Sequence, residues 1–237
     1  MDTIRRKLAL PFQTAFPFQI VGFDLDGTLL DTEQDLGAAL NHALSLIGRA
    51  PVAADSVRHL IGGGARQMLD RALAGSGGTA DIDVDRLHTE LIGYYRQHIA
   101  VHTRLYPGGA AMLDALAQRG VKLAVVTNKL EALAEQLLDE MALSERFYTI
   151  IGGDTLGPGR GKPKPDLILE MIARAACKPP LRAAFVGDTS FDTLAARAAG
   201  VPCVAVRFGY NDLPADELGA DAAIDHYDDL IPALERL

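Results

Sequence analysis

Two aspartates, two residues apart, follow an apolar stretch near the start of the sequence. Residues 20–24 read Ile-Val-Gly-Phe-Asp, and Leu25 separates Asp24 from Asp26. A carboxylate with an ordinary pKa of about 3.9 is ionised at neutral pH, so Asp24 can attack phosphorus without a base to activate it. Asp26 can donate a proton to the leaving group and later accept one from water. The pair predicts nucleophilic catalysis with an acid/base partner.

Three further polar clusters follow apolar stretches later in the chain. They are 127–129 (Thr-Asn-Lys), 162–165 (Lys-Pro-Lys-Pro) and 187–192 (Gly-Asp-Thr-Ser-Phe-Asp). In open parallel sheets, ligands bind at the carboxyl ends of the strands, so clusters in this position are expected to converge on Asp24 and Asp26. The sequence therefore predicts one site assembled from four segments.

The residue types in these clusters suit phosphoryl transfer. Asp24 and Asp188 offer the hard oxygen ligands that Mg2+ prefers, and the metal would neutralise the approach of a phosphate dianion. Lys162 would add a second positive charge, and Thr127 would donate a hydrogen bond to a phosphoryl oxygen. Lys164 is the alternative to Lys162 as the phosphate-binding lysine.

Composition and charge limit the class of protein. The chain has 237 residues, 49% of them hydrophobic and 23% charged, and it has no uninterrupted apolar run of the about 18 residues that a membrane span needs. A net charge of −8 argues against a nucleic-acid partner.

The two cysteines, Cys177 and Cys203, are expected to be packing residues in a reducing compartment, which predicts a cytoplasmic protein. The expected partner is a small anionic phosphomonoester, and the chain is expected to be a monomer or a homodimer.

Apolar runs alternate with helical patterns along most of the chain. This alternation predicts an α/β fold with a Rossmann-like parallel sheet core. Between 32 and 102 the pattern is helical throughout, which predicts an inserted all-helical cap whose first helix Asp31 or Thr32 can cap. The predicted strands are 20–24, 123–126, 148–151, 183–186 and 202–206, and the predicted helices are 32–47, 66–73, 85–101, 110–118, 130–141, 166–175 and 190–199.

The same pattern divides the chain into three parts. We expect an N-terminal extension at 1–19, a catalytic core at 20–31 and 103–237, and the cap at 32–102. The hinges between cap and core are expected at 30–33 and 102–107, where the chain leaves the core and returns to it.

The four clusters, in this order, resemble the haloacid dehalogenase superfamily from Ile20 onward. The resemblance implies that Asp24 is the nucleophile and Asp26 the acid/base. It implies that Mg2+ is held by the Asp24 and Asp188 carboxylates and the Asp26 backbone carbonyl, while Asp192 supports the metal's waters or Lys162. The residues placed at the metal are therefore Asp24, Asp26, Asp188 and Asp192, and those placed at the substrate, besides Thr127 and Lys162, are Gly27, Thr28, Asn128 and Arg66.

Features outside these motifs indicate which members of the superfamily the chain resembles. The dehalogenases of the superfamily lack an aspartate at the position of Asp26, and its transport ATPases have a lysine where this chain has Leu25. The helical insert is similar to the superfamily's mobile cap. Segments at 29–32, 61–65, 126–129 and 152–154 are similar to bacterial phosphoglycolate phosphatases, although related sugar-phosphate phosphatases share much of this pattern.

The resemblance implies hydrolysis of 2-phosphoglycolate to glycolate and phosphate. A sugar-phosphate phosphatase, an inorganic pyrophosphatase and a phosphosugar mutase remain alternatives, as does a non-catalytic protein that senses phosphometabolites. Arg66 follows the cap glycines 62–64 and is either a contact for the substrate's second anionic group or a solvated helix residue. His98 and His102 are four residues apart and can bridge a metal, but no further ligand is evident nearby.

Overall fold

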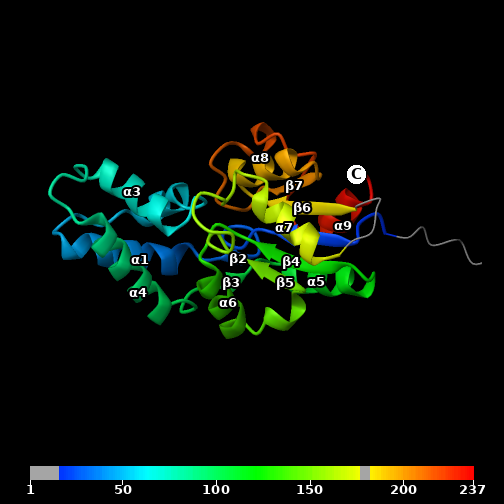
Figure 1. Ribbon diagram of the computed structural model, residues 1–237, viewed down its shortest axis with the longest axis horizontal. Coiled ribbons are helices and arrows are strands. Elements are labelled where there is room, and N and C mark those ends of the chain that lie inside the picture. The colour runs from blue at the N-terminus through cyan, green and yellow to red at the C-terminus, as the bar shows by residue number, and fades with distance from the viewer. Residues whose placement is uncertain (1–15, 177–181) are drawn as a thin grey trace, which may run out of the picture.

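Six parallel strands form the centre of the molecule. The computed structural model describes residues 16–176 and 182–237. The strand order is β5-β4-β1-β6-β7-β8, so β1, the first strand in the chain, lies inside the sheet (Figure 1). Every residue of β1, β6 and β7 is buried, as expected for parallel strands covered on both faces. The strands are β1 (Ile20–Phe23), β4 (Lys122–Val126), β5 (Thr149–Ile151), β6 (Ala183–Gly187), β7 (Cys203–Val206) and β8 (Ala222–Ile224).

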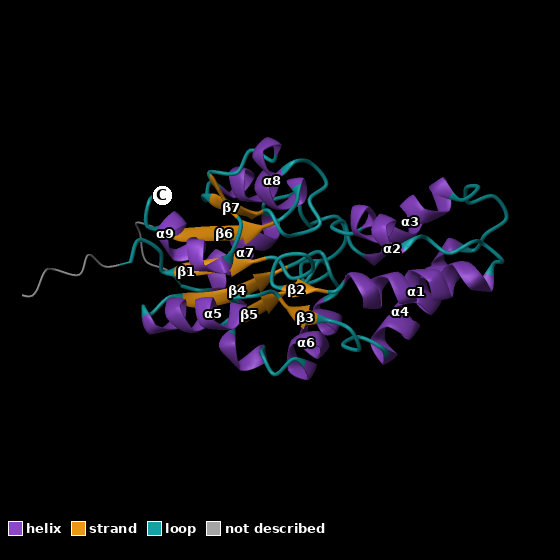
Figure 2. Cartoon of the chain, turned by 180° about the vertical axis from the view of Figure 1, so that it is seen from behind, coloured by secondary structure: helices purple, strands orange, loops and turns teal. Residues whose placement is uncertain are grey.

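Helices cover both faces of this sheet (Figure 2). Successive side chains of a strand point to opposite faces. Val21 therefore packs in one apolar cluster with α5, α6 and α9, and Ile20 packs in another with α7 and α8. The carboxyl ends of the strands stay free of these helices and are available for a site. The core helices are α5 (Gly109–Gln118), α6 (Glu131–Glu140), α7 (Asp166–Arg174), α8 (Ser190–Ala199) and α9 (Leu230–Leu234).

A helical cap is inserted between two short strands. β2 (Leu30–Asp31) pairs antiparallel with β3 (Arg104–Leu105), and this ribbon carries the chain out of the core and back. The cap lies at one end of the molecule, beyond the carboxyl ends of the core strands (Figure 1). Apolar residues of α1 and α4 are buried against each other and hold the cap together. The cap helices are α1 (Glu33–Leu46), α2 (Ala54–Val57), α3 (Ala65–Gly75) and α4 (Val84–Gln97), with a 3-10 turn at Arg58–Leu60 after α2.

The predicted parallel α/β sheet with an inserted helical cap is confirmed. Five predicted strands match β1, β4, β5, β6 and β7 to within one residue at each end. The ribbon, α2, β8 and α9 were not predicted. The helix predicted at 85–101 was too long, since His98 already leaves the helical conformation.

Of the two residues expected to cap the first cap helix, Asp31 provides a side-chain acceptor, since its Oδ1 accepts the Glu33 backbone N–H at 3.4 Å. Thr32 occupies the residue before α1, but its side chain makes no capping hydrogen bond. Its hydroxyl instead donates to Asp26 Oδ1 at 2.7 Å. The hydroxyl therefore contacts the site rather than the backbone of the helix.

The predictions for the N-terminal extension and for the two cysteines fall partly on residues outside the described chain. Most of the predicted N-terminal extension and Cys177 are in that part, whereas Cys203 is a free thiol buried in β7. No helix in the described part of the chain is both long enough and apolar enough to cross a membrane.

Asp35 ties the two ends of the cap together. It lies in the first turn of α1 with 2% of its surface exposed. Its carboxylate accepts backbone N–H bonds from His102 at 3.0 Å and Thr103 at 2.9 Å, and a hydroxyl bond from Thr103 at 2.8 Å. The negative charge is also favourable at a helix N-terminus. This buried carboxylate therefore fixes the returning segment to the departing one, next to the ribbon.

We expect Asp35→Ala to lower the free energy of unfolding by about 2–4 kcal/mol, because it leaves buried donors without an acceptor. Chemical denaturation measures this loss. The control is Asp55→Ala, which removes an exposed aspartate from the first turn of α2 and should cost no more than about 0.5 kcal/mol. Equal stability of the two variants would show that Asp35 does not hold the cap.

Candidate active site

Two buried aspartates meet at the carboxyl ends of neighbouring strands. β1 pairs in parallel with β6, with Phe23 opposite Val186, so Asp24 and Asp188 emerge side by side. Asp24 is 4% exposed and Asp188 is fully buried. Asp192, in the first turn of α8, completes a group whose carboxylate oxygens lie within 4.8 Å of one another. The predicted convergence of the first and fourth clusters is thus present in the structure.

Lys162 supplies the positive charge beside this group. Its ammonium lies 2.9 Å from Asp24 Oδ1 and donates to Asp192 Oδ1 at 2.5 Å, with only 1% of its side chain exposed. Lys164 is exposed and its ammonium donates to the carbonyl of Gly159. Of the two lysines considered from the sequence, the structure brings Lys162 to the aspartates.

Asp192 is held by the start of its own helix. Its Oδ2 accepts from the Thr189 backbone N–H at 3.0 Å and from the Thr189 hydroxyl at 2.7 Å, which forms a capping box. Oδ1 is left to face Lys162. Asp192 therefore joins the N-terminus of α8 to the buried ammonium.

Asp188 lies in a cradle of small and backbone groups. Thr28 donates its hydroxyl to Oδ1 at 2.8 Å, and the Tyr210 backbone N–H donates to Oδ2 at 2.8 Å. A Cβ at Gly27 would lie 2.3 Å from Asp188 Oδ2, and one at Gly209 would lie 2.3 Å from Asp188 Cβ. Both glycines are thus required by the close approach of the carboxylate. Gly209 and Tyr210 were missed in the sequence, where nothing distinguishes their loop.

Burial makes the charged state of these aspartates unfavourable. Loss of water, followed by the charge of Asp192, outweighs the attraction of Lys162 and raises the pKa of Asp24 to about 6. Burial, with the charges of Asp192 and Asp24, raises the pKa of Asp188 well above its ordinary value. Burial alone would lower the pKa of Lys162, but Asp192 and Asp24 reverse that effect and raise it.

Three carboxylates lie around one ammonium, so the group holds more acidic than basic side chains. Asp24 and Asp188 present hard oxygen donors, and Asp24 Oδ1 makes no aligned hydrogen bond within the described part of the chain although it is buried close to Lys162. A divalent cation bound by oxygen would satisfy both the charge and the orphaned atom. The cluster therefore fits a metal site.

Asp26 lies in a second ion pair beside the first. Both of its carboxylate oxygens accept hydrogen bonds from the Lys129 ammonium at 2.8 Å. The side chains are 5% exposed for Lys129 and 12% for Asp26. Lys129 had no assigned role in the sequence, although it directly follows Thr127 and Asn128, the second polar cluster. Its place after a core strand was the available signal.

The loop after β4 connects the other predicted groups. Thr127 is buried and its hydroxyl accepts from the Lys129 backbone N–H at 3.2 Å. Asn128 accepts from the Lys162 backbone N–H at 2.8 Å and donates to the carbonyl of Gly62 in the cap at 3.0 Å. The Asn128 side chain thus links the lysine loop of the core to the cap.

A pocket lies between the cap and these core groups. Asp24, Asp26, Thr127 and Asn128 line it from the core. Its cap side is mainly apolar and includes Leu36, Ile61, Met68, Leu91 and Tyr95. A molecule bound there meets the carboxylates at one end and the cap at the other.

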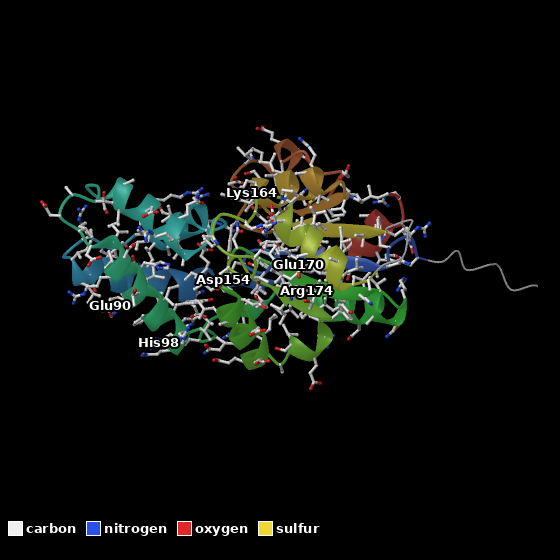
Figure 3. The ribbon with its side chains drawn as sticks, viewed as in Figure 1. Glu90, His98, Asp154, Lys164, Glu170 and Arg174 are labelled. Carbon is white, nitrogen blue, oxygen red and sulfur yellow. The ribbon has the colours of Figure 1, made fainter. Side chains whose placement is uncertain are left out.

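Arg66 and the two histidines are not brought to this pocket. Arg66 is half-exposed on α3 and pairs with Asp70 and Asp85, so the expected substrate contact is absent in this arrangement. His98 stacks on Tyr94 with ring centroids 4.2 Å apart. Figure 3 places His98 at the end of the cap helix α4, just after its last residue, and Lys164 on the core. His102 uses its backbone N–H to bind Asp35, and neither histidine belongs to a cluster of metal ligands among the described residues.

The comparisons with known proteins agree with this geometry. Residues 21–206 match the model of the haloacid dehalogenase-like hydrolases, which is more than half of the chain. The chain belongs to the haloacid dehalogenase-like hydrolases. This hydrolase is 45% identical over 213 residues to a phosphoglycolate phosphatase of Agrobacterium fabrum, which covers 90% of each chain. It is 41% identical to phosphoglycolate phosphatase 1 of Pseudomonas aeruginosa, covering 95% of this chain and 82% of the relative.

A solved structure supports the same membership. The crystal structure of a protein described as a predicted phosphoglycolate phosphatase from Haemophilus somnus superposes on this hydrolase with a TM-score of 0.84. The two are 29% identical, and the match covers 91% of this chain and 97% of the other. The resemblance found in the sequence is therefore confirmed for the superfamily and for its phosphoglycolate phosphatases as relatives.

The cradle of Asp188 predicts a large difference between two glycine substitutions. Gly27 and Gly48 both have positive φ, 85° and 68°, but an added Cβ meets Asp188 only at Gly27 and meets nothing within 4 Å at Gly48. We expect Gly27→Ala to lower kcat/KM for phosphomonoester hydrolysis by at least about 100-fold, because it displaces Asp188. Gly48→Ala carries a similar backbone strain and should leave kcat/KM within about two-fold of the parent protein. Comparable activity of the two variants would contradict the cradle.

Proposed function

We propose that this hydrolase cleaves 2-phosphoglycolate to glycolate and inorganic phosphate through an aspartyl-phosphate on Asp24. The observation that supports the chemistry is the buried cluster in which Asp24 lies 2.9 Å from Lys162 and lines one pocket together with Asp26. The names of the relatives support the choice of substrate.

The proposed reaction has two steps at phosphorus. An Asp24 carboxylate oxygen forms a bond to phosphorus while the bond to the glycolate oxygen breaks, and Asp26 gives that oxygen a proton. Asp26 then takes a proton from the water that attacks the aspartyl-phosphate, which frees phosphate and restores Asp24. Lys162 and the Thr127 hydroxyl stabilise charge on the phosphoryl oxygens during both steps.

We propose that the Asp24 and Asp188 carboxylates and the Asp26 backbone carbonyl hold Mg2+. When bound, the ion supplies Lewis-acid stabilisation of the phosphoryl charge. Asp192 acts mainly on Lys162, since its other oxygen is occupied by the cap of α8.

We also propose that the cap, at 32–102, opens and closes at hinges 30–33 and 102–107. Residues of the cap and of the core line the pocket together. In this proposal, movement of the cap opens the pocket to substrate. Closure excludes water while phosphorus is transferred to Asp24.

Solution scattering tests this movement. The metal-free, unliganded protein should sample open arrangements, and Mg2+ with vanadate, a phosphate analogue, should lower the radius of gyration as the cap closes. Mg2+ alone is the control. Identical scattering curves under all three conditions would contradict a mobile cap.

Steady-state hydrolysis tests the activity itself. With Mg2+, kcat/KM for 2-phosphoglycolate should exceed that for sugar phosphates, pyrophosphate and an aryl phosphate by about 100-fold or more. EDTA should abolish turnover, and Asp24→Asn should lower kcat by orders of magnitude while leaving the fold intact by circular dichroism. A flat substrate profile would reject 2-phosphoglycolate, and substantial activity in the Asp24 variant would reject the covalent mechanism.

A further inference from the structure

The pocket has one source of positive charge facing the part of the substrate that is not phosphate. Its cap wall is mainly apolar, and among the described residues that line the pocket Lys129 is the only basic one. Lys162 pairs with Asp24, the expected site of the phosphoryl group, and is not among the residues that line the pocket. A second anionic group on the substrate therefore has Lys129 as its available cation.

Lys129 has donor capacity beyond its pair with Asp26. An ammonium has three N–H donors. Two of these directions are used by the Asp26 oxygens, both at 2.8 Å, and the third lies near the Tyr95 hydroxyl, which helps to raise the pKa of Lys129. The ammonium also lies 4.6 Å from the centroid of the Tyr95 ring, which brings both residues to the same side of the pocket.

Tyr95 adds a second observation that points to a ligand. The residue is 1% exposed, and its hydroxyl lies near the Lys129 ammonium but finds no acceptor for its own proton in the described part of the chain. A buried hydroxyl without a partner costs free energy. Such a group in the wall of a binding pocket is explained when a bound molecule supplies the missing acceptor.

We propose that Lys129 and Tyr95 form a subsite for the second anionic group of the substrate, a carboxylate one carbon away from the phosphate ester oxygen. This inference rests on the proposed phosphatase activity and specifies its substrate class. A bound carboxylate accepts from the tyrosine hydroxyl and lies beside the positive charge of the ammonium. A neutral or apolar group in its place leaves these buried donors unpaired, so the subsite discriminates against it.

A different role for Lys129 predicts a different result. If the lysine served only to hold Asp26, every phosphomonoester would lose the same factor when Lys129 is changed, because Asp26 acts on all of them. If it binds a substrate carboxylate, substrates with that group lose more. The ratio of two kcat/KM values measured on one variant separates the two roles.

The experiment compares 2-phosphoglycolate with its neutral amide, 2-phosphoglycolamide, which has the same skeleton. The parent holoenzyme with Mg2+ should prefer the carboxylate by about 100-fold, and Lys129→Gln should reduce this preference by about 10- to 100-fold, mainly through KM. Lys129→Arg should keep most of it. Tyr95→Phe, which removes only the hydroxyl, should reduce it several-fold. Lys164→Gln, at an exposed lysine, is the matched control and should leave the preference unchanged.

The outcomes separate the subsite from the proposed function. No turnover of any phosphomonoester by the parent protein overturns the function, and the subsite with it. Turnover of both compounds at equal kcat/KM overturns the subsite and leaves the function standing. Equal losses for both compounds in Lys129→Gln and an unchanged ratio in Tyr95→Phe also overturn the subsite. Should Lys129→Gln fail to fold, the Tyr95→Phe ratio decides.

Discussion

Three carboxylates and one ammonium are buried together at the carboxyl ends of β1 and β6, and most of the site follows from the need to stabilise them. Removal of ions from water costs several kcal/mol each unless partners replace the lost hydration. Lys162 forms ion pairs with Asp24 and Asp192. When all three carboxylates are ionised, one ammonium still leaves an excess of two negative charges. Burial is the main cause of the raised pKa values of Asp24 and Asp188, and the neighbouring carboxylates add to it. A divalent cation held by these carboxylates would offset the excess charge.

Several parts of the fold position these charged side chains. The parallel pairing of β1 with β6 places Asp24 beside Asp188, and the absence of a side chain at Gly27 lets Asp188 approach. Tyr210 extends the arrangement toward the cap, because its backbone N–H binds Asp188 while its hydroxyl accepts the Thr32 N–H at 2.7 Å. Tyr210 therefore contacts both Asp188 and Thr32, the residue that precedes the first cap helix.

The core and its aspartates could be predicted from the sequence because both depend on local patterns. An apolar run that ends in a carboxylate identifies β1 and Asp24, and glycine followed by aspartate identifies β6 and Asp188. The cap side could not be predicted in the same way. Whether Arg66 or Tyr95 faces the pocket depends on how α3 and α4 rotate against the core, and the structure turns Tyr95 inward and leaves Arg66 paired with aspartates at the surface. Lys129 was within a recognised cluster, but only its distance to Asp26 reveals its role.

Covalent catalysis by Asp24 is the central claim, and the stereochemical course at phosphorus tests it most directly. A substrate whose phosphorus is made chiral with sulfur and two oxygen isotopes is hydrolysed in water that carries a third isotope. Two in-line displacements, first by Asp24 and then by water, predict net retention of configuration in the thiophosphate product. Net inversion would mean that water attacks the substrate directly, which would contradict the nucleophilic role of Asp24.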